Sequence, residues 1–173
     1  MKNYKELLKN ISTFIFDYDG VLSDGHVLIL SNGEHVRSGY VKDGFAIHLA
    51  LKKNYRVVVI SGGTADSMEA RCRILGITDV FLSVPDKLQV FKKFTSKNKI
   101  NAASVVYVGD DLPDLPAMKA AGVAVCPSDA AEEIKAISHY ISPYHGGKGC
   151  VRDIIEQVLK VQGKWMDNDA FIW

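Results

Sequence analysis

The sequence predicts a single α/β domain, spanning residues 1–173, built on a doubly wound parallel sheet. Short apolar runs rich in β-branched residues alternate along the chain with longer segments of helical period. Two of the runs, VVVI at 57–60 and VVYV at 105–108, have no polar face, which is typical of strands covered by helices on both sides. A chain of 173 residues has room for one such domain and little more.

The first strand is expected at Thr13–Phe16. A β-hairpin insertion at about residues 26–39 follows it, because Ser31-Asn32-Gly33-Glu34 sits between VLIL and HVRS and Asn-Gly supplies positive φ. The later strands are expected at Arg56–Ile60, Asp79–Leu82, Ser104–Val108 and Val123–Cys126. The helices are expected at Gly44–Lys53, Thr64–Leu75, Lys87–Lys97 and Pro113–Ala121, and near Ala130–Ile137 and Val151–Gln162.

The composition excludes several classes of protein. Lys and Arg number 21 against 20 Asp and Glu, so nothing points to nucleic acid or to an anionic membrane as a partner. No apolar run approaches the roughly 20 residues of a membrane span, and the start lacks a signal-peptide core. Cys72, Cys126 and Cys150 show neither a disulfide framework nor a zinc spacing. We therefore expect a cytoplasmic domain with reduced thiols.

Polar residues follow the predicted strands. Asp17-Tyr18-Asp19-Gly20 comes after the first strand and Ser61-Gly62-Gly63 after the second. Asp86-Lys87 lies just beyond the third, and the stretch from Gly109 to Asp114 follows the fourth. Because the carboxyl ends of parallel strands meet at one edge of a sheet, these segments are expected to converge on one crevice.

The expected contents of this crevice suit phosphoryl transfer. Five carboxylates so close together repel one another unless a cation offsets them, and oxygen ligands without His or Cys favour Mg²⁺. A lysine, a hydroxyl and glycine amides can hold a phosphoryl group in transit. One aspartate can attack phosphorus, and another can transfer the proton. The residues concerned are Asp17, Asp19, Asp110, Asp111 and Asp114, with Lys87, Ser61 and the glycines after it.

Taken in order, these motifs resemble those of the haloacid dehalogenase superfamily of phosphatases. The resemblance implies that Asp17 is the nucleophile and Asp19 the general acid/base, with Ser61 and Lys87 as the second and third motif residues. It implies that Mg²⁺ is bound by Asp17, by the backbone carbonyl of Asp19 and by Asp110. Asp111 and Asp114 would support the metal site, or would only cap the helix that follows.

A closer resemblance is to the capless phosphatases of 3-deoxy-D-manno-octulosonate 8-phosphate (KDO 8-phosphate). Its sequence carriers are Asp19–Gly25, Val41–Gly44, Gly109–Asp114, Arg71 with Leu75–Ile77, and Gly146–Gly149. It implies a homotetramer in which a neighbour replaces the cap, and release of phosphate and KDO, a lipopolysaccharide precursor. The substrate site that it implies comprises Asp19, Tyr40, Val41, Lys42, Asp43, Gly44, His48, Gly62, Gly63, Arg71 and Lys87. Two positions depart from the family pattern: Gly63 stands where many relatives have Arg, and His48 where some do.

Three other functions stay open at this point. Hydrolysis of a nine-carbon acid 9-phosphate (KDN or sialate) is the nearest, although a glutamate at 63 would have favoured it more. A phospho-accepting signalling domain also gathers aspartates at strand ends but lacks an acid two residues after the nucleophile. A catalytically inactive regulatory domain is disfavoured because every expected side chain is present.

The last ten residues, 164–173, hold Trp165, Met166, Phe171, Ile172 and Trp173. This is more apolar surface than a free tail leaves in water. We expect the hairpins to form the shared core of the tetramer. Each tail would then lie near the mouth of a site, its own or a neighbour's, and help to exclude water from it.

Overall fold

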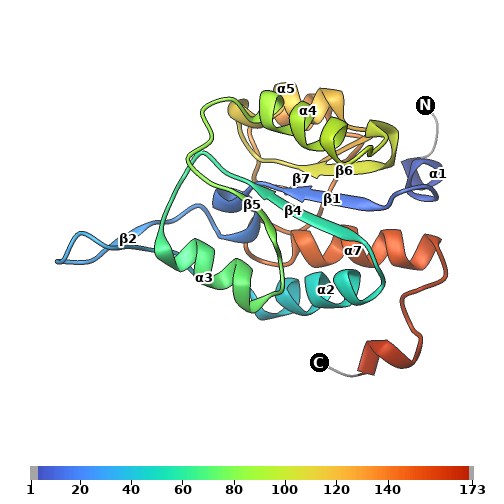
Figure 1. The fold of residues 1–173 in the computed structure, drawn as a ribbon, viewed down its shortest axis with the longest axis horizontal. Coiled ribbons are helices and arrows are strands. Elements are labelled where there is room, and N and C mark those ends of the chain that lie inside the picture. The colour runs from blue at the N-terminus through green and yellow to red at the C-terminus, as the bar shows by residue number, and fades with distance from the viewer. Residues whose placement is uncertain (1–3, 172–173) are drawn as a thin grey trace.

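The computed structural model describes residues 4–171, and its centre is one parallel sheet (Figure 1). The strand order is β5-β4-β1-β6-β7-β8, and every neighbouring pair is parallel. The strands are β1 (Thr13–Phe16), β4 (Arg56–Ile60), β5 (Asp79–Phe81), β6 (Val105–Val108), β7 (Val123–Cys126) and β8 (Tyr140–Ile141). The predicted α/β fold with a parallel sheet is confirmed.

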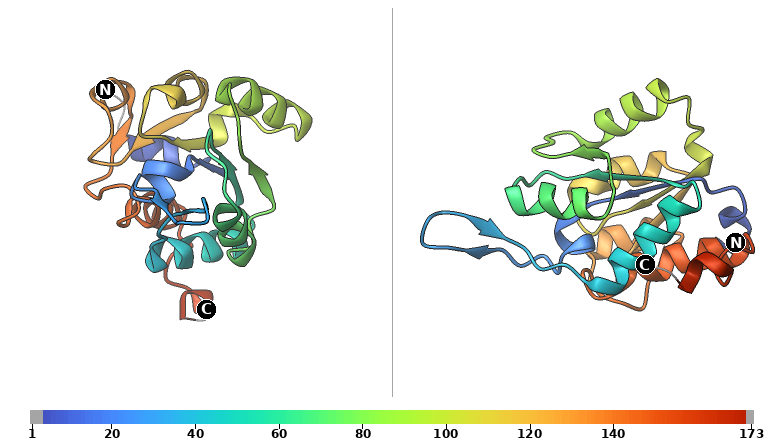
Figure 2. Two further views of the ribbon diagram at one scale, coloured as in Figure 1. Left: turned by 90° about the vertical axis from the view of Figure 1, so that its left-hand side faces the viewer. Right: turned by 60° about the horizontal axis from the view of Figure 1, so that its bottom comes forward.

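Helices cover both faces of the sheet, so the domain has three layers (Figures 1 and 2). Side chains of β1 alternate between the layers: Phe14 and Phe16 pack on one side and Ile15 on the other. The first side is covered by α1 (Tyr4–Leu8), α2 (Val41–Lys52), α3 (Asp66–Ile74) and α7 (Cys150–Val161). The second side is covered by α4 (Lys87–Lys97), α5 (Leu115–Ala120) and α6 (Glu132–Ile137). Burial on both faces explains the apolar runs.

The predicted elements are present, with small shifts at their ends. Strand β6 begins at Val105 because Ala102–Ser104 forms a 3₁₀ turn. The helix expected at Pro113–Ala121 divides into a 3₁₀ turn at Leu112–Asp114 and α5, with a proline early in each. The sequence analysis did not predict α1 or β8. Both are short, and two residues of β8 cannot display a period.

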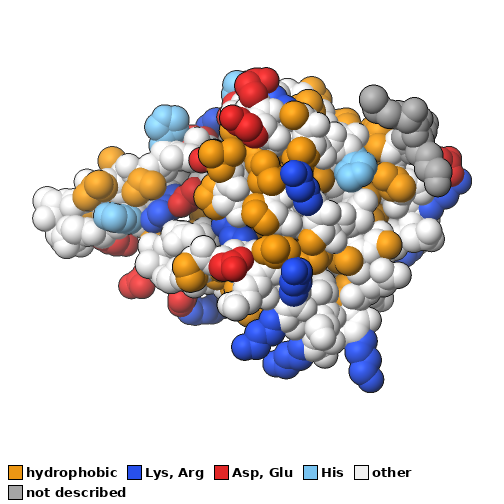
Figure 3. Space-filling view, turned by 90° about the horizontal axis from the view of Figure 1, so that it is seen from above, with side chains coloured by type: hydrophobic (Ala, Val, Ile, Leu, Met, Phe, Trp, Pro, Cys, Tyr) orange, Lys and Arg blue, Asp and Glu red, His pale blue; other side chains and the backbone are white. Residues whose placement is uncertain are grey.

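The predicted hairpin is present and projects from the body of the domain (Figure 2). Strand β2 (Leu28–Ile29) pairs antiparallel with β3 (His35–Val36). Of the Asn-Gly pair only Gly33 has positive φ, +83°; the Asn32 side chain instead accepts a hydrogen bond from the Glu34 amide. Hydrophobic side chains gather on this projecting end (Figure 3), where Leu28 and Ile29 are 63% and 65% exposed.

The tail docks on its own chain. Trp165 is buried, with the Arg152 guanidinium 5.0 Å from its ring centroid. Lys53, just after α2, bonds to Asp167 and Asp169. These contacts lie where β4 begins, at the end of the domain opposite the carboxyl edge of the sheet. The prediction that the tail lies near its own site is therefore wrong as far as Phe171; Ile172 and Trp173 lie outside the described residues, and contact with a neighbour's site stays a prediction.

Between Tyr4 and Phe171, no helix is both long enough and apolar enough to cross a bilayer.

Helices α2 and α7 are joined by a buried carboxylate. The Oδ1 atom of Asp43, in the first turn of α2, accepts a hydrogen bond of 2.7 Å from the Arg152 amide in the first turn of α7. Burial raises the pKa of Asp43 to about 6, although the amides of Arg152 and Gly149 act in the opposite direction. The folded chain therefore binds a proton at Asp43 more readily than the unfolded chain, whose carboxyl has the ordinary value of 3.8.

The raised pKa predicts how Asp43 affects stability. Its contribution is fully present below the unfolded pKa and is lost as the pH rises through about 6. Asp43→Asn removes this dependence, so the variant should gain stability relative to wild type between pH 4 and 7, on the order of 2 kcal/mol. Urea denaturation at both pH values measures it, with exposed Asp66→Asn as the control for losing one carboxylate. A stability difference that is the same at both pH values would contradict the prediction.

Candidate active site

A cavity of about 310 Å³ lies at the carboxyl edge of the sheet. All four polar segments expected there contribute to it, so the structure brings together what the sequence spreads over a hundred residues. Its lining comprises Asp17, Asp19, Gly20, Gly25, Ser61, Gly62, Gly63, Lys87, Asp110, Asp111, Pro113 and Asp114.

The loop after β1 is shaped by close contact with the loop after β6. The Asp17 amide donates to the Val108 carbonyl, which extends the pairing of β1 with β6 by one step. Gly20 then turns with φ of +84°, and a Cβ built there would lie 2.0 Å from Asp110 Oδ2. A glycine at this position is therefore required for Asp110 to approach Asp17.

Lys87 lies between two buried carboxylates. Its Nζ is 2.9 Å from Asp17 Oδ1 and 2.7 Å from Asp114 Oδ1. Burial raises the pKa of Asp17 well above its ordinary value, and the negative charge of Asp114 adds to this, while Lys87 acts against both. Burial alone would lower the pKa of Lys87, but the two carboxylates raise it overall, so the lysine stays charged.

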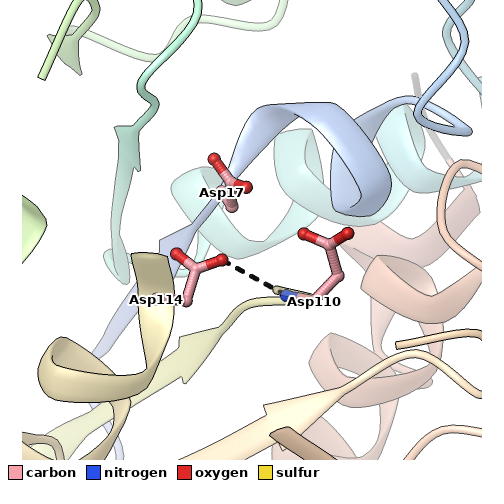
Figure 4. Close-up of side chains that lie close together, drawn as sticks. All are labelled: Asp17, Asp110 and Asp114. Carbon is pink, nitrogen blue, oxygen red and sulfur yellow. Dashed lines mark hydrogen bonds between the residues drawn. The ribbon is translucent and has the colours of Figure 1, made fainter. Parts of the chain in front are cut away.

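Asp17, Asp110 and Asp114 form a cluster that offers three carboxylate oxygens within 4.8 Å of one another (Figure 4). Burial, with the neighbouring charge of Asp114, raises the pKa of Asp110 to about 7. Such crowding is relieved by a cation, and a set made only of oxygens suits a hard divalent ion such as Mg²⁺. The residues present therefore fit the expected metal.

Both carboxylate oxygens of Asp114 accept hydrogen bonds from protein groups. Its Oδ1 accepts from Lys87 and from the Tyr107 hydroxyl at 3.0 Å, and its Oδ2 accepts from the Asp110 amide at 3.3 Å (Figure 4). Asp114 thus contacts both Lys87 and Asp110, and its supporting role at the metal site stays a prediction. Tyr107 was not predicted, because a tyrosine in a strand first indicates core packing. Asp111 is exposed and accepts from the Leu112 amide, so it caps the 3₁₀ turn.

Asp19 lines the same cavity as that cluster. It is held by Arg37, whose Nε lies 3.1 Å from Oδ1 and whose Nη2 lies 3.0 Å from Oδ2. Ser61 is buried, and its Oγ accepts from the Gly63 amide at 3.2 Å, which shapes the turn across the cavity. Sequence reasoning missed Arg37, because nothing in the pattern of the hairpin distinguishes it from a solvated arginine.

Several residues of the implied substrate site lie elsewhere in this chain. Tyr40, Asp43, Gly44 and Arg71 line a separate small cavity beside Tyr18. Tyr40 also lines a hollow of about 180 Å³ by the start of α7, and Lys42 lines this second hollow. Two further ones are on α2, Val41 largely exposed and His48 half-buried. Only Asp19, Gly62, Gly63 and Lys87 of that set line the acidic cavity.

Comparison with known proteins decides the family. The family model described as "Hydrolase: haloacid dehalogenase-like hydrolase" matches residues 36–122. The 3-deoxy-D-manno-octulosonate 8-phosphate phosphatase KdsC of Escherichia coli K12 is 38% identical over 156 residues, 90% of this chain and 83% of the relative. The chain belongs to the haloacid dehalogenase-like hydrolases, in the family of KDO 8-phosphate phosphatases.

Solved structures of this phosphatase family agree with the fold throughout. The Moraxella catarrhalis phosphatase, in complex with magnesium, phosphate and KDO, has a TM-score of 0.93 at 34% identity over 99% of this chain and 98% of that one. The cobalt-bound Haemophilus influenzae phosphatase has a TM-score of 0.90 at 32% identity over 96% and 99%. Membership of this hydrolase family separates the chain from the phospho-accepting signalling domains.

The hydrogen bond from Tyr107 to Asp114 in this haloacid dehalogenase-like site gives a testable prediction. Tyr107→Phe removes one donor from Asp114, which then orients Asp110 and Lys87 less firmly. Losing such an outer contact costs about 10-fold or more in metal affinity, so half-maximal activity should need about 10-fold more Mg²⁺. Phosphate release from p-nitrophenyl phosphate over a Mg²⁺ titration measures it.

The matched control is Tyr55→Phe, which removes a hydroxyl that bonds to Gln162 at the opposite end of the domain. It should leave the Mg²⁺ requirement unchanged. An unchanged requirement in Tyr107→Phe as well would show that the Asp114 contact does not support the metal site.

Proposed function

We propose that the chain hydrolyses KDO 8-phosphate to KDO and phosphate, with Mg²⁺ bound and through an aspartyl-phosphate on Asp17. The observation that carries the chemistry is the buried Asp17–Lys87 pair in a cavity with four more carboxylates. The substrate is supported by relatives 34% to 38% identical that are named for it. It is also supported by the solved relative in complex with KDO.

In the first step a carboxylate oxygen of Asp17 forms a bond to phosphorus, and the bond from phosphorus to the sugar oxygen breaks. Asp19 gives its proton to that leaving oxygen. In the second step water attacks the phosphoryl group, Asp19 takes the proton of the water, and the carboxylate of Asp17 is released with free phosphate. The two steps together consume one water and regenerate both aspartates.

The other groups of the cavity balance charge. Lys87 and the amides after Ser61 donate to the phosphoryl oxygens, whose charge increases toward the transition state. Asp17, Asp110 and the main-chain carbonyl of Asp19 would hold Mg²⁺, which when bound supplies further positive charge beside the phosphoryl group. Asp114 keeps Lys87 directed at Asp17.

The assembly we propose is a homotetramer built on the hairpins. Four consecutive apolar residues, Val27–Leu30, are 37% to 65% exposed on the projecting hairpin (Figure 3). A second copy of the same hairpin is a fitting partner for this apolar arm, and burying it would bring neighbouring surfaces toward the cavity mouth. A monomeric full-length protein in analytical ultracentrifugation would contradict this assembly.

The mechanism predicts that Asp17→Asn keeps the fold and loses essentially all turnover, because an amide is a poor nucleophile. EDTA should abolish wild-type activity and Mg²⁺ should restore it. Phosphate release over a panel of sugar phosphates, with circular dichroism on the variant, checks both, and Asp66→Asn is the matched control. Wild-type turnover by Asp17→Asn, or full activity in metal-free buffer, would refute the mechanism.

The substrate assignment is tested at Arg71. Its planar guanidinium suits the carboxylate of a 2-keto acid. If it binds that group in the assembled enzyme, Arg71→Ala should raise KM for KDO 8-phosphate about 10-fold or more, the effect of one charged hydrogen bond. KM for p-nitrophenyl phosphate should change much less. Exposed Arg73→Ala on the same helix is the control, and equal effects on both substrates would remove Arg71 from sugar recognition.

A further inference from the structure

Arg37 brings a buried guanidinium to the edge of the catalytic cavity. It directly follows β3, on the return arm of the hairpin, yet its side chain is only 5% exposed. Nε and Nη2 each donate to a different oxygen of Asp19. Such a two-point contact between planar groups fixes the plane of the carboxylate as well as its position.

The two oxygens of Asp19 have different surroundings. Oδ1 accepts from Arg37 and also from Ser23 Oγ at 3.1 Å, and Ser23 is fully buried. Among residues 4–171, Oδ2 accepts a hydrogen bond from Arg37 alone. A carboxylate oxygen has two lone pairs, so Oδ1 is saturated by its two donors while Oδ2 retains a lone pair.

Oδ2 is also the oxygen on the side of the cavity. A Cβ built on Gly63 would lie 3.0 Å from Oδ2, 3.3 Å from Arg37 Nη2 and 3.6 Å from Ser61 Oγ. Oδ2 therefore lies beside the Ser61–Gly63 turn, which lines the same cavity as Asp17. The absence of a side chain at Gly63 leaves the space that the Arg37–Asp19 pair occupies.

The position of Arg37 leaves one of its buried donors without a hydrogen bond. Its Nη1 is buried and has no hydrogen-bond partner among the described residues. A buried donor without a partner is unfavourable by about 1–3 kcal/mol, and such exceptions call for an explanation. Packing and the two bonds to Asp19 outweigh that cost, which indicates that the orientation of Asp19 is what the arrangement secures.

We propose that Arg37 is a positioning residue: it fixes the Asp19 carboxylate so that Oδ2 is the atom that exchanges the proton with the leaving oxygen and with water. This rests on the proposed role of Asp19 and assigns that role to one atom and one supporting side chain. Ser23 helps by holding Oδ1. Lys at this position would supply charge without the fork, and so would orient the carboxylate less firmly.

The test compares Arg37→Gln, Asp19→Asn and the double variant. A sugar-acid phosphate has an alcohol leaving group that needs the proton, whereas nitrophenolate leaves without it. Displacing a reacting group by about 1 Å can cost 10²-fold, so Arg37→Gln should lower kcat for KDO 8-phosphate by about that factor with little change in KM. With p-nitrophenyl phosphate it should keep a rapid burst of nitrophenolate, followed by slow turnover as the aspartyl-phosphate waits for its base.

Coupling between the two residues separates positioning from a general loss of structure. In the Asp19→Asn background, Arg37→Gln should cause little further loss, because the group that it positions is already disabled. Arg37→Lys should fall between wild type and Arg37→Gln. Exposed Arg73→Gln is the matched control, and circular dichroism confirms the fold. If Arg37→Gln does not fold, Ser23→Ala and Arg37→Lys carry the same comparison.

Additive losses in the double variant would overturn the proposal, as would a burst slowed as much as steady-state turnover. Faster turnover by Arg37→Gln would also overturn it, since Arg37 would then be restraining Asp19. If the wild type does not hydrolyse KDO 8-phosphate, the substrate assignment fails by itself. The burst and the coupling can still be measured on p-nitrophenyl phosphate.

Discussion

The contact of Lys87 with Asp17 and Asp114 is the interaction on which the site depends. Three carboxylates converge there, and one lysine charge offsets one of them. Two carboxylates are left without an offsetting charge from Lys87, and one divalent cation would balance them. Asp19 does not enter this count because Arg37 pairs with it. Removing Lys87 would leave buried carboxylates unpaired, which is more costly than never having built the pair.

The hairpin links the chemistry to the surface of the molecule. Its outgoing arm carries exposed apolar residues, and its return arm carries Arg37, which holds Asp19. The Ser67 hydroxyl of α3 donates to the His35 carbonyl, so the arm is also fixed to the body beside the second polar segment. The hairpin therefore has one exposed apolar arm and one anchored arm that reaches the acidic cavity.

The strands and the aspartates that follow them are predicted well, because their sequence patterns have one main structural interpretation. Unbroken apolar runs such as 57–60 allow only a strand buried on both faces, and aspartates after strand ends converge because parallel strands share an edge. Arg37 and Tyr107 were not predicted because their contacts are not visible in a sequence pattern. Arg37 contacts Asp19, 18 residues before it, and Tyr107 contacts Asp114, which lies beyond the end of its strand. Asp43 is assigned to substrate by resemblance, and that role stays a prediction; its contact with the first turn of α7 could not be read from the sequence because it joins residues 109 apart.

The residues implied for the phosphoryl group and those implied for the sugar lie in different parts of the fold. The groups proposed to act on phosphorus lie at the ends of the central strands, where the sheet fixes them within one chain. Of the groups implied for the substrate, some lie around the first turn of α2 and on α3, outside the acidic cavity, namely Tyr40, Asp43, Gly44 and Arg71; Asp19, Gly62, Gly63 and Lys87 line that cavity. The tail, at least to Phe171, is bound at the far end of the domain by Lys53 and the stacking of Arg152 on Trp165. Within residues 4–171, part of the set implied for the sugar therefore lies apart from the groups implied for phosphoryl transfer, and the proposed assembly is where the two sets would meet.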